Sequence, residues 1–325
     1  MPELMREPNA EQTRDATPLL AARQLVRRYG DKTAVDRVDL TVSRGNVLGL
    51  LGPNGAGKST TLEMLAGQLA PEAGSIQING EDMLANPHRA LMQVGYLPDQ
   101  PPLYPELRVD EFLAYCAALH RLAPALRHTR CQAVKQACGL ADHGGRIIRH
   151  LSRGYQQRLG IAQAIIHDPS LLILDEPTVA LDPLELASLR SLIAELAQNR
   201  GILLSTHILS EVEAICSHVA VIRHGRIVFF GSLQDLKSSG EGRWHLRFGQ
   251  RPDLNRMSPA DMPERIWLRE DGRIELHGSP ETLDAFIAAS IRQGWKLREL
   301  TPAGVSLEQR FRDLTQAPGT GVNRT

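Results

Sequence analysis

Three short, mainly apolar runs mark the first two-thirds of the sequence. They cover residues 47–51 (VLGLL), 171–174 (LLIL) and 202–206 (ILLST). Runs of this kind are typical of strands that lie buried on both faces of a parallel sheet. Residues 38–42 (VDLTV) instead alternate strictly between apolar and polar, which predicts a half-buried, antiparallel strand. The pattern therefore predicts both fully buried and half-exposed strands.

Helical patterns lie between these strands. Residues 58–66 predict a helix, and residues 106–165 are mostly helical in pattern. Residues 183–200 predict a further helix with Asp182 as its N-cap. The remaining elements of this part are a short helix at 209–216 and strands at 218–223 and 226–230. Strands that alternate with helices indicate an α/β sheet.

The pattern changes after about residue 238. Residues 243–248 alternate, and residues 266–277 predict a hairpin with a turn at Asp271-Gly272. The elements that follow are a helix opened by Ser279-Pro280 and ended by Gly294, a strand at 295–300 and a helix at 306–314 capped by Ser306. We therefore expect a small α+β accessory domain at residues 238–316. The polar segments 1–18 and 317–325 are expected to be tails.

Composition narrows the function classes. The 325 residues include 37 Lys and Arg and 37 Asp and Glu, so the formal net charge is zero, which argues against a bulk nucleic-acid binder. The four cysteines form no C-x-x-C pair, so they indicate a reduced intracellular set and suggest neither a disulfide framework nor a zinc site. The N-terminus lacks the apolar region of a signal peptide, and no apolar run approaches 18 residues. We therefore expect a cytoplasmic chain that needs a partner for any membrane role.

Residues 52–60 (GPNGAGKST) carry the clearest chemistry. They match G-x-x-x-x-G-K-[ST] between a predicted buried strand and a predicted helix, which is the context of a phosphate-binding loop. Glycines let the backbone fold around a phosphate, Lys58 supplies a positive charge, and the Ser59 hydroxyl is a Mg²⁺ ligand. The predicted nucleotide contacts are Gly52, Pro53, Asn54, Gly55, Ala56, Gly57, Lys58, Ser59 and Thr60.

Two carboxylates follow the buried run at residues 171–174. They stand at the carboxyl end of a strand, where open α/β sheets bind ligands. We expect Asp175 to hold Mg²⁺ through water and Glu176 to act as the general base on the attacking water. Alone, they could be two solvated strand-end acids; the phosphate loop favours the catalytic interpretation.

From about Leu19 to Leu236, the order and spacing of these motifs resemble the ATP-binding subunits of ABC transporters. The resemblance implies a P-loop NTPase fold of the ABC ATPase type. This fold is a mixed sheet with an antiparallel β-subdomain and a helical subdomain. The ATPase domain would span residues 19–237, with its helical subdomain at about 100–165.

The resemblance also assigns roles to individual residues. Tyr29 would stack on adenine, although an exposed tyrosine in a turn is the alternative. Ser152 and Gly154 of LSRGY (151–155) would contact the γ-phosphate of ATP held by the opposing subunit, and a helix N-cap role for Ser152 is compatible with this. His207 resembles the switch histidine that reaches the γ-phosphate, with a purely structural role as the alternative.

Asp182, in the segment ALD, resembles the D-loop aspartate of the family. Its alternative role is that of an N-cap only, with Glu185 completing a capping box. In the glutamine loop, Asp99 stands where glutamine is usual and Gln100 follows it. Alignment favours Asp99 as the Mg²⁺ and coupling residue, with Gln100 as the rival.

The signature departs from the family consensus at Arg153 and Tyr155, which stand in place of Gly and Gln. However, the segments GYLP-acid and LS-x-GY-x-QR, and the ending SLEQRFRDLT, resemble exporters whose ATPase is a separate chain. The resemblance therefore implies an ATPase that uses ATP and Mg²⁺ to power export by a separate membrane permease. The chain would form a homodimer, or a heterodimer with a related ATPase, peripheral on the inner face of the cell membrane.

We expect residues 99–122 to carry the motion to the permease, with Leu103, Tyr104 and Phe112 as a groove lip or, individually, as ordinary core residues. The alternative function is a non-transport ABC ATPase of translation or DNA repair. That class carries two such domains in one chain, or long coiled coils or zinc modules. This chain has one phosphate loop, no sustained heptads and no metal pattern, and no nucleic-acid partner is expected.

Overall fold

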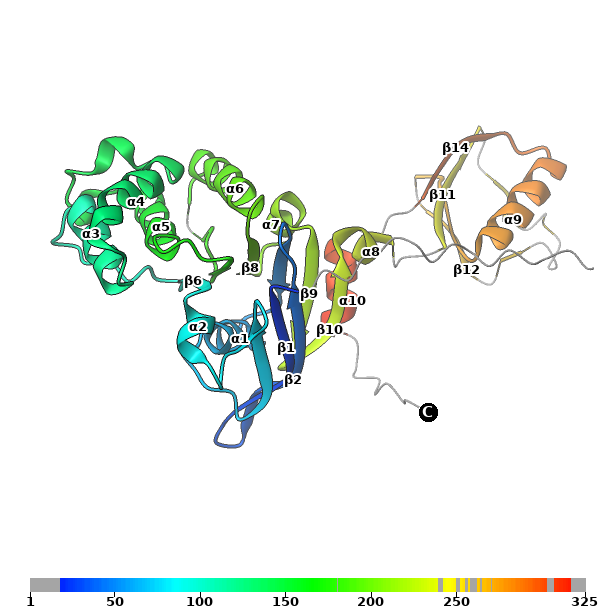
Figure 1. Ribbon diagram of the computed structural model, residues 1–325. Helices are drawn as coiled ribbons and strands as arrows, with labels where there is room; N and C mark the ends of the chain where they lie inside the picture. The colour runs from blue at the N-terminus through cyan, green and yellow to red at the C-terminus, as the bar shows by residue number, and fades with distance from the viewer. Residues whose placement is uncertain are drawn as a thin grey trace, which may run out of the picture. The chain divides into compact units, whose positions relative to one another are not determined.

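The computed structural model describes residues 18–179, 181–238, 242–249, 252–254, 257, 262–263, 265–269, 271–302 and 307–316 (Figure 1). The chain forms two compact units. Unit 1 is Met1–Val47 and Thr60–Leu203, and unit 2 is Leu48–Ser59 and Leu204–Thr325. Except for Pro18, the two predicted tails lie outside the described residues. The predicted domain boundaries, including the one between residues 237 and 238, stay a prediction.

Unit 1 contains an antiparallel sheet with the strand order β2-β1-β4-β5. Its strands are β1 (Leu20–Tyr29), β2 (Lys32–Val42), β4 (Ala73–Ile78) and β5 (Glu81–Asp82). The predicted strand at 38–42 is the end of β2, and it pairs antiparallel with β1. Val38, Leu40 and Val42 are buried while Asp39 and Thr41 are exposed, so the alternating pattern correctly predicts a half-buried strand.

A second, largely parallel sheet carries the three apolar runs. Its strands are β3 (Val47–Leu51), β6 (Val94–Leu97), β7 (Leu171–Leu174), β8 (Gly201–Thr206), β9 (His218–Arg223) and β10 (Arg226–Ser232). The order is β10-β9-β3-β8 in unit 2 and β8-β7-β6 in unit 1, where β8 contributes residues to both units. β3 is parallel to β9 and β6 is parallel to β7, while β10 returns antiparallel to β9. Every residue of β3, β7 and β8 is buried, as their continuous apolar character predicts.

The helices of the first part of the chain follow the predicted order, except that α2 was not predicted. They are α1 (Lys58–Leu65), α2 (Pro87–Leu91), α3 (Val109–Leu119), α4 (Pro124–Ala137), α5 (Arg153–Ala164), α6 (Pro183–Ala197) and α7 (Leu209–Ile215). α3, α4 and α5 pack on one another within unit 1 (Figure 1). α3 ends at Leu119, with His120 as its C-cap, and the next residue, Arg121, has a φ of 56°, which a helix cannot continue through.

The last part of unit 2 is a four-stranded antiparallel sheet with the order β12-β13-β11-β14. Its elements are β11 (Arg243–Phe248), β12 (Arg265–Leu268), β13 (Ile274–His277), α9 (Pro280–Arg292) and β14 (Leu297–Pro302). The predicted hairpin is confirmed as β12 and β13, and Gly272 in its turn has a φ of 78°. Leu246, Ile274 and Phe286 are fully buried, which gives this sheet and α9 a core of their own.

Two further helices complete unit 2. They are α8 (Leu233–Ser238) and α10 (Leu307–Gln316). The second confirms the predicted terminal helix, although the predicted cap, Ser306, lies outside the described residues. α10 packs on α8 and on β9, which is a strand of the parallel sheet.

Candidate functional site

The phosphate loop leaves β3 at Gly52 and enters α1 at Lys58. Gly52 lies against β9, because a Cβ atom there would stand 2.5 Å from the backbone oxygen of Ile222. Gly55 and Gly57 have φ angles of 76° and 108°, in the region that favours glycine. The loop is therefore a backbone structure that side chains at these positions would disrupt.

Hydrogen bonds hold the loop in place within unit 2. The Ala56 N–H donates to the Pro53 oxygen at 3.2 Å, and the Gly225 N–H donates to the Ala56 oxygen at 2.9 Å. Pro53, Asn54, Gly55 and Ser59 remain exposed, while Ala56 is buried. The side of the loop that these exposed residues form is open to a ligand.

Lys58 is the first residue of α1, and only 6% of it is exposed. Its Nζ donates to the oxygens of Gly52 at 2.9 Å and Pro53 at 3.4 Å, so the ammonium folds back across the loop. A helix N-terminus attracts anions, and the ammonium adds a full charge. Of the predicted loop residues, unit 2 holds Gly52 to Ser59 and unit 1 holds Thr60.

Asp175 and Glu176 follow the last residue of β7 in unit 1, as the sequence predicts. Asp175 is only 4% exposed, and its backbone N–H donates to the Leu97 oxygen at 2.8 Å. Glu176 is half-buried and has a φ of 46°. This conformation is uncommon for a residue other than glycine, and such strain is concentrated at functional sites.

The ring of Tyr96 in β6 lies in the field of several carboxylates. Burial, followed by the negative charges of Asp175, Glu63 and Asp99, raises the pKa of Tyr96 far above its ordinary value. The structure therefore brings Asp99 and Asp175 into the surroundings of one ring. Gln100 is exposed, as is Asp99.

Ser152 is the N-cap of α5, in line with the helix-cap role considered from the sequence. Its Oγ accepts a hydrogen bond from the Tyr155 N–H at 3.4 Å and donates to Glu185 Oε1 at 2.8 Å. Gly154 is buried, and a Cβ atom there would overlap with the Glu185 carboxylate. The sequence does not predict this contact of Glu185, because nothing local links two residues that are 33 positions apart.

Asp182 caps α6, as predicted, and its Oδ1 accepts from the N–H groups of Leu184 at 2.9 Å and Glu185 at 2.8 Å. Ala180, the first residue of the predicted D-loop segment, lies outside the described residues. The capping role therefore has direct support, while a role of Asp182 toward nucleotide stays a prediction.

His207 directly follows a strand, and Tyr29 is the last residue of one. His207 is exposed directly after β8 in unit 2, where Thr206 Oγ1 donates to Glu211 Oε2 at 2.9 Å and accepts from the Ile208 N–H at 3.0 Å. Tyr29 ends β1 in unit 1 and is 49% exposed. The Arg27 guanidinium lies 5.3 Å from the centre of the Tyr29 ring. Both side chains are thus accessible from solvent.

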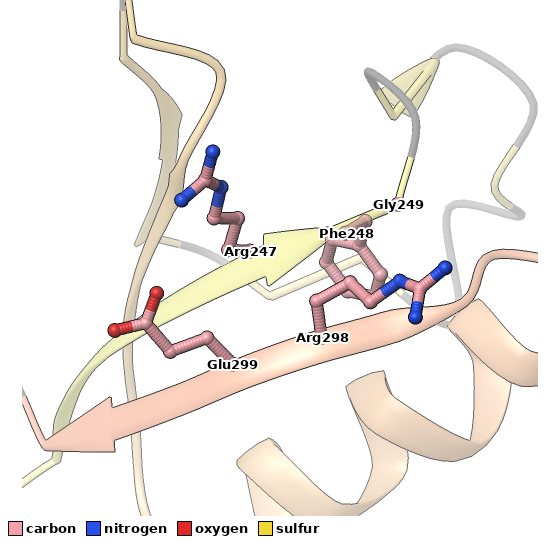
Figure 2. Close-up of a pocket in the computed structure, with 5 residues that line it drawn as sticks. All are labelled: Arg247, Phe248, Gly249, Arg298 and Glu299. Carbon is pink, nitrogen blue, oxygen red and sulfur yellow. The ribbon is translucent and has the colours of Figure 1, made fainter.

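A separate cavity of about 440 Å³ lies in the C-terminal sheet, beside β11 and β14. Arg247 pairs with Glu299, but the next pair is Phe248 with Leu297, so Arg298 stands in a bulge. Figure 2 shows the guanidinium groups of Arg247 and Arg298 pointing away from one another. The two side chains therefore do not form a clamp for one phosphate.

Comparison with known proteins gives one family. A profile of the ABC transporter family matches residues 35–179. Nod factor export ATP-binding protein I of Ralstonia nicotianae is 40% identical over 225 residues, which cover 68% of this chain and 69% of that protein. The ABC transporter ATP-binding protein YdbJ of Bacillus subtilis is 33% identical over 304 residues, covering 93% of this chain and 97% of that protein.

The similarity extends to solved structures. One structure, of an ATP-binding subunit of an ABC transporter, has a TM-score of 0.62 and 34% identity, and the match covers 68% of this chain and 92% of that chain. The fold is therefore that of an ABC ATPase, as the sequence predicts. The chain belongs to the ABC transporter family, in which it is an ATP-binding and ATP-hydrolysing subunit with export proteins among its relatives.

Proposed function

We propose that this chain powers export through a separate membrane permease, by means of an ATP-driven dimer. One observation carries the proposal. The chain presents two different helix N-termini with phosphate-binding character, one at Lys58 after the glycine-rich loop and one at Ser152 before α5. In the proposed dimer, each ATP molecule lies between the phosphate loop of one subunit and the signature segment of the other.

In this proposal the phosphate loop binds ATP and Glu176 activates water. The Glu176 carboxylate accepts a proton from the attacking water, whose oxygen bonds to the γ-phosphorus while the bond from that phosphorus to the ADP oxygen breaks. Lys58 and His207 stabilise the negative charge on the γ-phosphate oxygens. Tyr29, with its ring half-exposed, stacks on the adenine.

The donor set also suits Mg²⁺. The proposed ligands are the hydroxyl of Ser59 and the carboxylates of Asp175 and Asp99, with Gln100 as the rival of Asp99. All of them offer the oxygen atoms that this hard cation prefers. The bound ion would neutralise negative charge on the β- and γ-phosphates.

An aromatic surface beside the glutamine loop is the proposed contact with the permease. Tyr104 is 48% and Tyr115 42% exposed, and their ring centres lie 5.6 Å apart in an edge-to-face arrangement. Phe112 is only 1% exposed, so it is a core residue that supports Tyr104 from 6.2 Å away. Exposed aromatic side chains are enriched at protein interfaces.

We further propose that the chain works at the inner face of the cell membrane. Among the residues that the structure describes, no helix has both the length and the apolar character to cross a bilayer. The membrane path would come from the permease.

The test is to purify the tagged chain from detergent-solubilised membranes and to identify its partners by mass spectrometry. We expect an integral membrane protein to co-purify. Proteoliposomes that contain this chain together with that membrane protein should show ATPase activity. Proteoliposomes made with the Glu176→Gln variant should lack it. Co-sedimentation with ribosomes or DNA, with no membrane protein in the purified material, would favour the non-transport alternative and contradict the proposal.

A further inference from the structure

The carboxylate of Glu185 lies at the N-terminus of α5, although Glu185 belongs to α6. Its Oε1 accepts the 2.8 Å hydrogen bond from Ser152 Oγ. The same carboxylate covers Gly154, since a Cβ atom at that position would overlap with it. α5 and α6 both belong to unit 1 and pack on one another (Figure 1).

The structure of α6 itself does not require Glu185 to lie there. Glu185 is the third residue of its helix, where a carboxylate commonly reaches back to the backbone N–H of the N-cap. Here Asp182 caps the helix with its own side chain. The Glu185 carboxylate is instead directed to Ser152, at a helix end that attracts negative charge.

Under the proposed function, Ser152 and Gly154 meet the γ-phosphate of the ATP that the partner subunit binds. A carboxylate oxygen and a phosphate oxygen compete for the same hydroxyl donor, and the two negative charges repel one another. We propose that Glu185 is an internal stand-in for the γ-phosphate, which sets how much ATP is needed to close the dimer. This inference rests on the proposed function.

A second polar contact allows Glu185 to leave without separating the helices. Arg158 of α5 donates to the Ser188 Oγ of α6 and, at 2.9 Å, to the Cys138 oxygen. These bonds do not involve Glu185. Rotation of one half-buried side chain therefore suffices to uncover Ser152 and Gly154.

The experiment measures dimer formation against ATP concentration by light scattering after gel filtration. Every protein carries Glu176→Gln, so that ATP is retained. The test variants add Glu185→Gln or Glu185→Ala. The matched control adds Glu195→Gln, which removes the charge of an exposed glutamate further along the same helix.

The parent protein carries Glu176→Gln alone. We expect both Glu185 variants to reach half-maximal dimerisation at an ATP concentration about two- to fivefold below the one that the parent needs. This is the range expected for the loss of one surface charge contact. The control should match the parent, and the affinity of all monomers for ADP should be unchanged. An unchanged or higher ATP requirement in both Glu185 variants would overturn the inference while leaving the proposed function intact. A parent that stays monomeric at saturating ATP would instead overturn the proposed function, and the inference with it.

Discussion

The phosphate loop and the signature segment are both helix N-termini that suit an anion, yet they are built differently. At the phosphate loop, the Lys58 ammonium donates to two neutral backbone oxygens, of Gly52 and Pro53. At the signature segment, the Ser152 hydroxyl donates to the charged carboxylate of Glu185. An incoming phosphate thus meets a cation at one terminus and an anion at the other. We therefore expect ATP to bind the phosphate loop first. Engaging the signature segment then costs the additional free energy of displacing the Glu185 carboxylate from Ser152.

The largest effect on activity is expected at Glu176. Without its carboxylate, unreacted ATP would stay between the phosphate loop of one subunit and the signature segment of the other. Glu176→Gln should lower kcat by about 10²- to 10⁴-fold, because an amide cannot accept the proton from water. Phosphate release measures kcat, and equilibrium binding of ATP is the control, which should remain. Turnover at the native rate would show that Glu176 is not the base.

The next largest effect is expected at Lys58, the cation of the phosphate loop. Lys58→Ala should weaken ATP binding by at least about tenfold, as expected for the loss of charge-assisted hydrogen bonds. Fluorescence titration with an ATP analogue measures the Kd, and circular dichroism checks that the variant is folded. An unchanged Kd would remove the argument for the phosphate loop.

A glycine in each of the two segments should differ in how much its replacement lowers stability. Gly52→Ala should lower the free energy of unfolding by about 1–3 kcal/mol, because the new methyl group meets the rigid backbone oxygen of Ile222. Gly154→Ala should cost less, because the atoms it meets belong to the end of the Glu185 side chain, which can move away.

Urea unfolding measures both glycine variants. Gly145→Ala is the control, since a Cβ atom there would have no neighbour within 4 Å. Equal losses of unfolding free energy for Gly52→Ala and Gly154→Ala would contradict this expectation. They would show that the backbone oxygen near Gly52 is no harder to displace than the Glu185 side chain near Gly154.

The smallest effect concerns the metal. Asp99→Ala should raise the Mg²⁺ concentration needed for half-maximal ATPase activity severalfold, and Gln100→Ala should raise it less. The reason is that a carboxylate is the better ligand for a hard cation, and Asp99 acts on the same tyrosine ring as Asp175. A larger effect of Gln100→Ala would transfer the role to that residue.

Local patterns predicted much of this molecule. The apolar run at 47–51 became the buried strand β3, Asp182 became the cap of α6, and Asp271-Gly272 became the turn between β12 and β13. Each of these features depends on residues close together in the chain. The expected roles of Lys58, Ser59, Asp175 and Glu176 come from the motifs themselves and from the strands that precede them. The family resemblance supplies the roles of the other site residues, and all of these roles stay predictions.

Other features were not predicted, because they depend on distant or unusual contacts. The contact between Glu185 and Ser152 joins residues far apart in sequence, and the positive φ of Glu176 has no sequence signal of the kind that a glycine gives. The short strands β4, β5 and β6 were also not predicted, because the apolar runs of β4 and β6 are brief and β5 consists of two acidic residues. Tertiary pairing decides such segments more than local propensity does.

The proposed function requires that two copies of this chain close on ATP. Its most direct test is the molar mass of the Glu176→Gln protein, measured by light scattering with and without saturating MgATP. We expect a monomer without nucleotide or with ADP, and a mass twice as large with ATP. A monomeric mass with ATP, also in the presence of the co-purified membrane protein, would contradict it.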